Sequence, residues 1–124
     1  FNEGYCSTQP DRLIRRELCD EAIRLGNLLA AHPEARSPEG DALLALMYLH
    51  ASRFDARVDG HGGLLLLEDQ DRSLWDHEKI QLAIEALEKV QRWRPEHLIH
   101  LTDYVRAIKR LAAVCRKGEP DDLT

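Results

Sequence analysis

The chain has 124 residues, of which 44% are apolar and 31% are charged, and its formal net charge is −5 at pH 7. This length and composition are typical of one globular domain with its own core, and they argue against a membrane-spanning or low-complexity protein. The acidic balance also argues against a nucleic-acid surface, because such surfaces carry a clustered basic excess.

The cysteines bear on the compartment. There are three of them, Cys6, Cys19 and Cys115, and no two form a CxxC pair. An odd number without paired spacing argues against a disulfide framework or a zinc knuckle, so a reducing cytoplasm fits best.

The chain opens at Phe1 directly in motif-like sequence. We therefore expect residues 1–124 to be a single helical domain that is a fragment of a longer protein.

The first long helix is predicted over Asp11–Ala31, and His32-Pro33 ends it. Gly26 inside this helix costs roughly 1 kcal/mol relative to alanine, and close packing against another helix is the best reason for its presence. The expected apolar face consists of Leu13 or Ile14, Leu18, Ala22, Leu25 or Gly26, and Leu29.

The segment Asp41–Phe54 is predicted to be a buried helix. No residue from Ala42 to Leu49 is charged, and a helix that is apolar all round belongs in a core. It is too short to cross a bilayer, which needs about 20 apolar residues. The polar connector 34–40 is short, so the two helices should form an antiparallel hairpin.

The next stretch breaks the helical pattern. The glycine-rich segment Asp59–Gly63 is followed by four leucines at 64–67. This pattern predicts a small β-hairpin or an extended insertion near 56–68. An isolated hairpin is marginally stable, so we expect the insertion to pack on the helices.

Two further helices are predicted in the second half. Asp76 or Ser73 can cap a helix that runs to about Arg92. The buried face of this helix is expected to comprise Ile80, Ala83 or Ile84, Leu87, and Val90 or Gln91. The last helix is predicted from about Glu96 to Lys117, with Leu98, Ile99, Val105, Ile108, Ala112 and Cys115 turned inward.

Together these elements predict a mainly α fold, an antiparallel helix-hairpin bundle of four to five helices. Residues 21–33 and 85–95 each resemble the second helix of a tetratricopeptide repeat, with apolar positions at helical spacing and a closing proline. The bundle is therefore expected to be tetratricopeptide-like.

Two groups of polar residues have side chains of the kinds found in metal or catalytic sites. Asp69, Asp71 and Asp76 lack the central glycine and closing glutamate of a calcium loop, so helix caps and salt bridges are favoured. His50 lies near Ser52 without a nucleophile elbow, so a hydrogen-bonded core histidine is favoured. We expect no catalysis, no metal and no cofactor.

Three blocks of the sequence together resemble one protein family. They are Phe1–Tyr5, then Leu43–Arg53 followed by Ala56-Arg57, and then Leu66–Asp76; Leu18-Cys19 with Glu21–Leu25 fits between them. The chain resembles the C-terminal extension of a subfamily of bacterial extracytoplasmic-function RNA polymerase sigma factors. The resemblance covers about residues 1–76, is most specific at 69–76 and does not reach the last predicted helix.

The resemblance implies a non-catalytic regulatory domain that modulates transcription initiation in the cytoplasm. Its partners would be the sigma regions of the parent protein or core RNA polymerase, without direct DNA contact and without a membrane. Stacked helix pairs offer a surface for such contacts. The candidate interaction residues are Arg53, Arg57, Asp69, Asp71, Arg72 and Trp75. The rival interpretation is that these residues only lock the insertion onto the helices.

Two other functions remain open at this point. One is a stand-alone small-molecule or metal-binding helical protein that uses His50, His61 and the 69–76 stretch. The other is a helical scaffold that forms a homodimer through an apolar face such as Ile99–Cys115.

Overall fold

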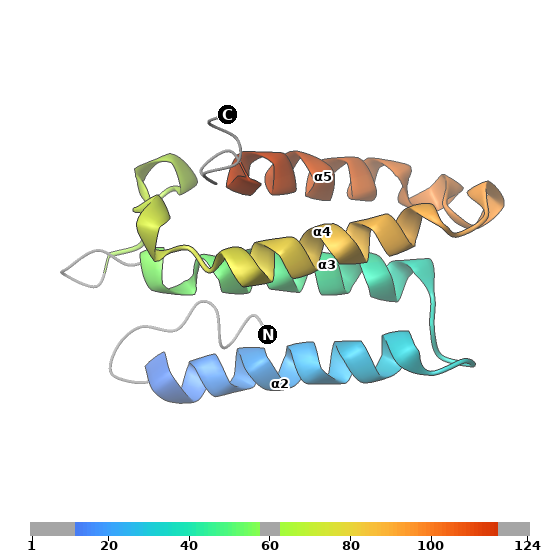
Figure 1. Cartoon of the computed structure of the whole chain (residues 1–124), viewed down its shortest axis with the longest axis horizontal. Coiled ribbons are helices and arrows are strands. Elements are labelled where there is room, and N and C mark those ends of the chain that lie inside the picture. The colour runs from blue at the N-terminus through green and yellow to red at the C-terminus, as the bar shows by residue number, and fades with distance from the viewer. Residues whose placement is uncertain (1–11, 58–62, 117–124) are drawn as a thin grey trace.

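Four α-helices run up and down through the described part of the chain (Figure 1). The structure is a computed structural model that describes residues 12–57 and 63–116. The helices are α2 (Arg12–Ala31), α3 (Pro38–Ser52), α4 (His77–Gln91) and α5 (Thr102–Arg116). Short 3-10 turns join them: η1 (Phe54–Ala56), η2 (Leu67–Asp69), η3 (Arg72–Leu74), η4 (Pro95–His97) and η5 (Ile99–Leu101). The predicted mainly helical bundle is confirmed.

Helix α3 is the centre of the bundle, as its sequence predicts. It packs against α2, α4 and α5, and most extensively against α4. Ala42, Ala45 and Leu49 are completely buried. The helix begins at Pro38, three residues before the predicted start, because Ser37 caps it: the Ser37 hydroxyl accepts a hydrogen bond of 3.0 Å from the Gly40 N–H. Proline suits the first helical position, where its missing N–H is not needed.

The apolar face predicted for the first helix is only partly the buried one. Leu18, Leu25 and Leu29 are 44%, 48% and 57% exposed. Helix α2 instead buries a narrower stripe that includes Cys19 and Ile23. It lies at one edge of the bundle and has its main helix contact with α3 alone, so one flank of its apolar surface has no cover within the described residues.

Gly26 lies on the side of α2 that packs against α3. A Cβ atom at Gly26 would lie 3.0 Å from Cε of Met47 and 3.1 Å from Cδ1 of Leu44. The expectation that this glycine serves close helix packing is therefore confirmed.

Helix α4 follows its prediction closely. Asp76 caps it by accepting a hydrogen bond of 3.2 Å from the Lys79 N–H. The backbone N–H of Asp76 also donates to the Ser52 carbonyl over 2.7 Å, which ties the start of α4 to the end of α3. Its buried face carries Ile80, Ala83, Ala86, Leu87 and Val90.

The predicted β-hairpin near 56–68 is not a hairpin in the described residues. No strand is assigned there; a single backbone hydrogen bond of 2.7 Å runs from the Leu65 N–H to the Arg57 carbonyl. Leu64 forms an isolated β-bridge, and Leu66 is extended and leads into η2, which agrees with the alternative of an extended insertion. The predicted turn at 59–62 lies outside the described residues. Four leucines in a row do not alternate with polar residues, so they give a strand no single buried face.

The last helix starts at Thr102, six residues after the predicted start. Residues 95–101 form η4 and η5, because the chain must reverse direction after α4 before α5 can run antiparallel to it. Ile99, predicted to face inward, lies on the outside of this reversal and is 74% exposed. Val105, Ile108, Ala112 and Cys115 are buried as predicted. None of the helices in the described residues combines the length and apolarity that crossing a membrane requires.

Replacing Gly26 by valine should lower the free energy of unfolding by about 1–3 kcal/mol, because the added atoms overpack the contact with Leu44 and Met47. Urea unfolding followed by circular dichroism measures this. Leu28→Val is the matched control, since Leu28 is exposed on the same helix. A loss in Gly26→Val no larger than that in Leu28→Val would mean that the contact with Leu44 and Met47 has room for the added atoms.

Candidate functional site

The sequence-predicted residues gather where α3 ends, α4 begins and α5 ends, at the left of Figure 1. Arg72 is the link between these parts. Its Nη1 donates a hydrogen bond of 3.0 Å to the Val114 carbonyl. That carbonyl belongs to the last turn of α5, where the carbonyl groups of a helix lack the partners that the next turn would supply. Arg72 therefore closes the C-terminal end of α5 from a segment 42 residues away.

Trp75 anchors the same segment in the core. Its side chain is only 3% exposed, and its indole N–H donates to Oε1 of Gln70 over 3.2 Å. The guanidinium carbon of Arg72 lies 4.5 Å from the centre of the indole ring, within the range of a cation–π contact. Gln70 is itself buried and donates from Nε2 to the Leu65 carbonyl over 3.3 Å. The buried polar groups here are thus paired with one another.

Arg53 and Arg57 surround His50 at the end of α3. Burial lowers the pKa of His50 to about 4, with the positive charges of Arg53 and Arg57 as further causes. The imidazole is therefore neutral at pH 7. Nη2 of Arg53 lies 3.3 Å from Nδ1 of His50, and because a guanidinium can only donate, Nδ1 is the acceptor. The predicted hydrogen bond is confirmed, but His50 is half-buried and does not belong to the core.

Cys115 faces the same cluster from α5. The thiol is fully buried, and burial raises its pKa despite the nearby positive charges of Arg53 and Arg72. A thiol that is buried and protonated is a poor nucleophile.

Asp69 and Asp71 lie apart from these buried groups. Both are exposed. Asp71 caps η3 by accepting from the Ser73 N–H at 3.0 Å and from the Ser73 hydroxyl at 2.7 Å, and these bonds lower its pKa. The structure therefore brings Arg53, Arg72 and Trp75 together and turns the two acids to solvent. Within residues 12–57 and 63–116, no group of three or more His, Cys, Asp or Glu side chains could hold a metal ion.

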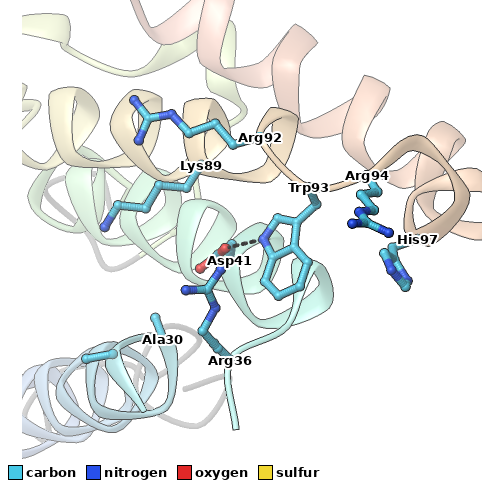
Figure 2. A pocket seen from close by; sticks show the side chains of 9 residues that line it. Ala30, Arg36, Asp41, Lys89, Arg92, Trp93, Arg94 and His97 are labelled. Carbon is cyan, nitrogen blue, oxygen red and sulfur yellow. Dashed lines mark hydrogen bonds between the residues drawn. The ribbon is translucent and has the colours of Figure 1, made fainter. Parts of the chain in front are cut away.

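A second feature lies at the opposite end of the bundle. It is a groove of about 630 Å³ between the end of α2, the start of α3 and the end of α4, and we call it the basic groove (Figure 2). Four of its nine lining residues carry a positive charge. The lining residues are Ala30, Ala31, Arg36, Asp41, Lys89, Arg92, Trp93, Arg94 and His97.

Trp93 and Asp41 define the inner part of the basic groove. The indole N–H of Trp93 donates a hydrogen bond of 2.9 Å to Oδ2 of Asp41, a carboxylate that is only 6% exposed. The guanidinium carbon of Arg36 lies 5.0 Å from the centre of the Trp93 ring. The centres of the His97 and Trp93 rings lie 6.5 Å apart, and the two rings form a T-shaped pair. Figure 2 shows Arg36 on one side of this indole and Arg94 and His97 on the other.

The cations of the basic groove are largely without acidic partners. Among the described residues, no carboxylate lies within 4.0 Å of the nitrogens of Arg36, Lys89 or Arg92. Arg94 has Glu96 at 3.9 Å, but both side chains are more than half exposed, so this pair contributes little. The groove therefore concentrates positive charge on a chain whose net charge is −5.

Sequence reasoning missed the basic groove. Residues 89–94 read Lys-Val-Gln-Arg-Trp-Arg, which puts three cations and a tryptophan in six positions. That local density was the available signal, but Arg36 and Asp41 join it only through the fold.

Comparison with known proteins places the chain in a family. The model of a family of unknown function, DUF6596, matches residues 1–91. The chain belongs to this family. The matched range contains the predicted residues Arg53 to Trp75 and ends with the last residue of α4, so Trp93, Arg94 and His97 of the basic groove follow it.

One relative is a protein of Rhizobium meliloti (strain 1021) described as an uncharacterized protein. It is 45% identical to this chain over 94 residues, which cover 76% of this chain and 22% of the relative. The chain thus spans about a fifth of the length of the curated relative it matches. No solved structure matches the chain significantly.

Replacing Arg72 by alanine should lower the free energy of unfolding by about 1.5–3 kcal/mol, because it removes a charged hydrogen bond to the end of α5. Arg110→Ala, an exposed position on α5, is the matched control. Thermal unfolding of both variants measures the difference. If Arg72→Ala and Arg110→Ala unfold at the same temperature, the hydrogen bond to the Val114 carbonyl does not stabilise the position of α5.

His50 predicts a pH dependence of stability. Its pKa of about 4 lies below the ordinary value of 6.5, so the unfolded chain binds more protons between these pH values. Stability should therefore fall as the pH drops from 6.5 towards 4. The full pKa shift corresponds to about 3 kcal/mol in the free energy of unfolding. Solvent around the half-buried ring screens the charge, so the measured change should be smaller.

Urea unfolding at several pH values, compared with His50→Gln, isolates this contribution from that of the carboxylates. The stability difference between the two proteins should change between pH 6.5 and 4. A constant difference would contradict the lowered pKa.

Proposed function

We propose that this chain is a non-catalytic protein-interaction domain, the C-terminal helical extension of an extracytoplasmic-function type sigma factor. It would modulate transcription initiation through contacts with the sigma regions of the parent protein or with core RNA polymerase. The resemblance of residues 1–76 to such extensions supports this proposal. The length of the Rhizobium relative is compatible with it, since more than three quarters of that protein lie outside the match.

The observation that carries the proposal is the meeting of two separate sequence blocks. The blocks that resemble the sigma-factor extensions, 43–57 and 66–76, meet at one end of the bundle, where α3 ends and α4 begins. The hydrogen bond from the Asp76 N–H to the Ser52 carbonyl joins them directly. The buried residues of the first block thus support the second block, whose exposed residues form a local surface on the helices, as an interaction domain requires.

Within this surface the predicted residues divide into two roles. Arg53 and Trp75 are buried and Arg72 is bonded to α5, so they fix the shape of the segment. The exposed Asp69 and Asp71 are available to a partner. The rival interpretation, that all six residues only lock the insertion, therefore applies best to the buried ones. The exposure of the two acids also argues against a metal or ligand pocket built on them.

The test is co-elution of the chain with the sigma regions of its parent protein and, separately, with core RNA polymerase. Asp69→Lys should weaken binding about tenfold through charge reversal at the contact. Glu85→Lys, an exposed reversal on α4, should leave binding unchanged. Absence of binding to both partners at tens of micromolar would refute the proposal, and equal losses in both variants would move the contact away from Asp69.

A further inference from the structure

The basic groove has the chemistry of a binding site for a negatively charged segment. Its cations come from two separate parts of the chain, Arg36 in the connector after α2 and Lys89, Arg92 and Arg94 at the end of α4. Like charges repel when they are held together, so their grouping has a cost unless an anion offsets it. We propose that the basic groove docks an acidic peptide segment of a partner protein.

The ends of the helices explain only part of this charge. Cations in the last turn of α4 interact favourably with the negative end of its macrodipole, which is a sufficient reason for Lys89 and Arg92. It is not a reason for Arg36, which lies five residues beyond the end of α2. Arg36 has no carboxylate within 4.0 Å among the described residues, although it lines the same groove as the buried Asp41.

The groove suits a short peptide better than a nucleic acid. Single-stranded nucleic acids stack their bases on exposed aromatic faces, but Arg36 lies over the Trp93 ring at 5.0 Å. The buried carboxylate of Asp41 lies inside the groove and would repel a continuous phosphate backbone. Separate carboxylates can instead meet Arg36, Lys89 and Arg92 individually as charge-assisted hydrogen bonds.

This inference deepens the proposed interaction function and rests on it for the partner, since it names the chemistry of the segment that the partner would supply. The surface is distinct from the one that carries Asp69 and Asp71, which lies at the other end of the bundle. A partner could therefore lose one contact and retain the other. For that reason the groove can be tested with peptides alone.

The experiment is a titration of the ¹⁵N-labelled chain with a capped ten-residue peptide of alternating glutamate and glycine, followed by NMR. The chain has two tryptophans, Trp75 and Trp93, so two indole N–H signals report on the two ends of the bundle. The Trp93 signal should shift saturably, and the Trp75 signal should not move. A peptide with lysine in place of glutamate should cause no shift, and 0.5 M salt should weaken the binding because the contacts are exposed.

Variants locate the contact. Arg36→Ala and Arg92→Ala should each weaken binding about two- to fivefold, the effect of losing one exposed charge pair. Arg110→Ala removes an exposed cation from α5 outside the groove and should leave the affinity unchanged. Retained dispersion of the amide spectrum shows in each case that the variant is folded.

Three outcomes would overturn the proposal: no shift of the Trp93 signal at millimolar peptide and low salt, equal losses in all three variants, or tighter binding of ten-residue oligothymidine through Arg36 and Arg92. The last outcome would assign the groove to nucleic acid. Failure of peptide binding together with successful co-elution would remove the groove alone, whereas peptide binding without co-elution would leave the groove standing and remove the sigma-factor partners.

Discussion

The burial of α3 is the constraint on which the rest of this structure depends. A helix without charged residues from Ala42 to Leu49 must be covered on several sides, and α2, α4 and α5 all pack on it. Its polar ends are tied as well. Near the start, Asp41 accepts from the Trp93 indole, and at the end, the Ser52 carbonyl accepts from the Asp76 N–H. Both bonds join α3 to the residues that flank α4. The two hydrogen bonds therefore hold α4 alongside α3 at both of its ends.

The two ends of the bundle differ in how the connecting segments use the remaining space. After α3, the described residues 53–57 and 63–76 lie over the ends of the helices, where Trp75 is buried and Arg72 is hydrogen-bonded to α5. Before α3, the connector 32–37 and the residues after α4 leave a groove of about 630 Å³ lined by cations. The first end carries exposed acids and the second carries exposed bases. A partner that contacts both would be held in one orientation, because each end repels the charge that the other attracts.

The features closest to the proposed function were partly visible in the sequence. The block 66–76 stood out because its acids, arginine and tryptophan are unusual neighbours, and the fold shows why the tryptophan and arginine are there. The exposure of Asp69 and Asp71 and the burial of Arg53 could not be derived from spacing, since each depends on which neighbour covers the segment. The basic groove could not be predicted from the sequence, because Arg36 and Arg92 are 56 positions apart in the chain. They line the same groove only when α2 and α4 both pack near α3.

The sequence by itself determined the presence of the helices, the central place of α3, the choice of Asp76 or Ser73 as the cap of α4, and most of the buried faces of α4 and α5, because each follows from local periodicity and capping chemistry. Tertiary structure decided the rest. Helix α2 lies at one edge of the bundle and has one main helix neighbour, so it exposes Leu18, Leu25 and Leu29. Ile99 is exposed because the chain must turn back before α5. Apolar periodicity says which residues can be buried, but whether a neighbour arrives to bury them is settled only by the packing of distant segments.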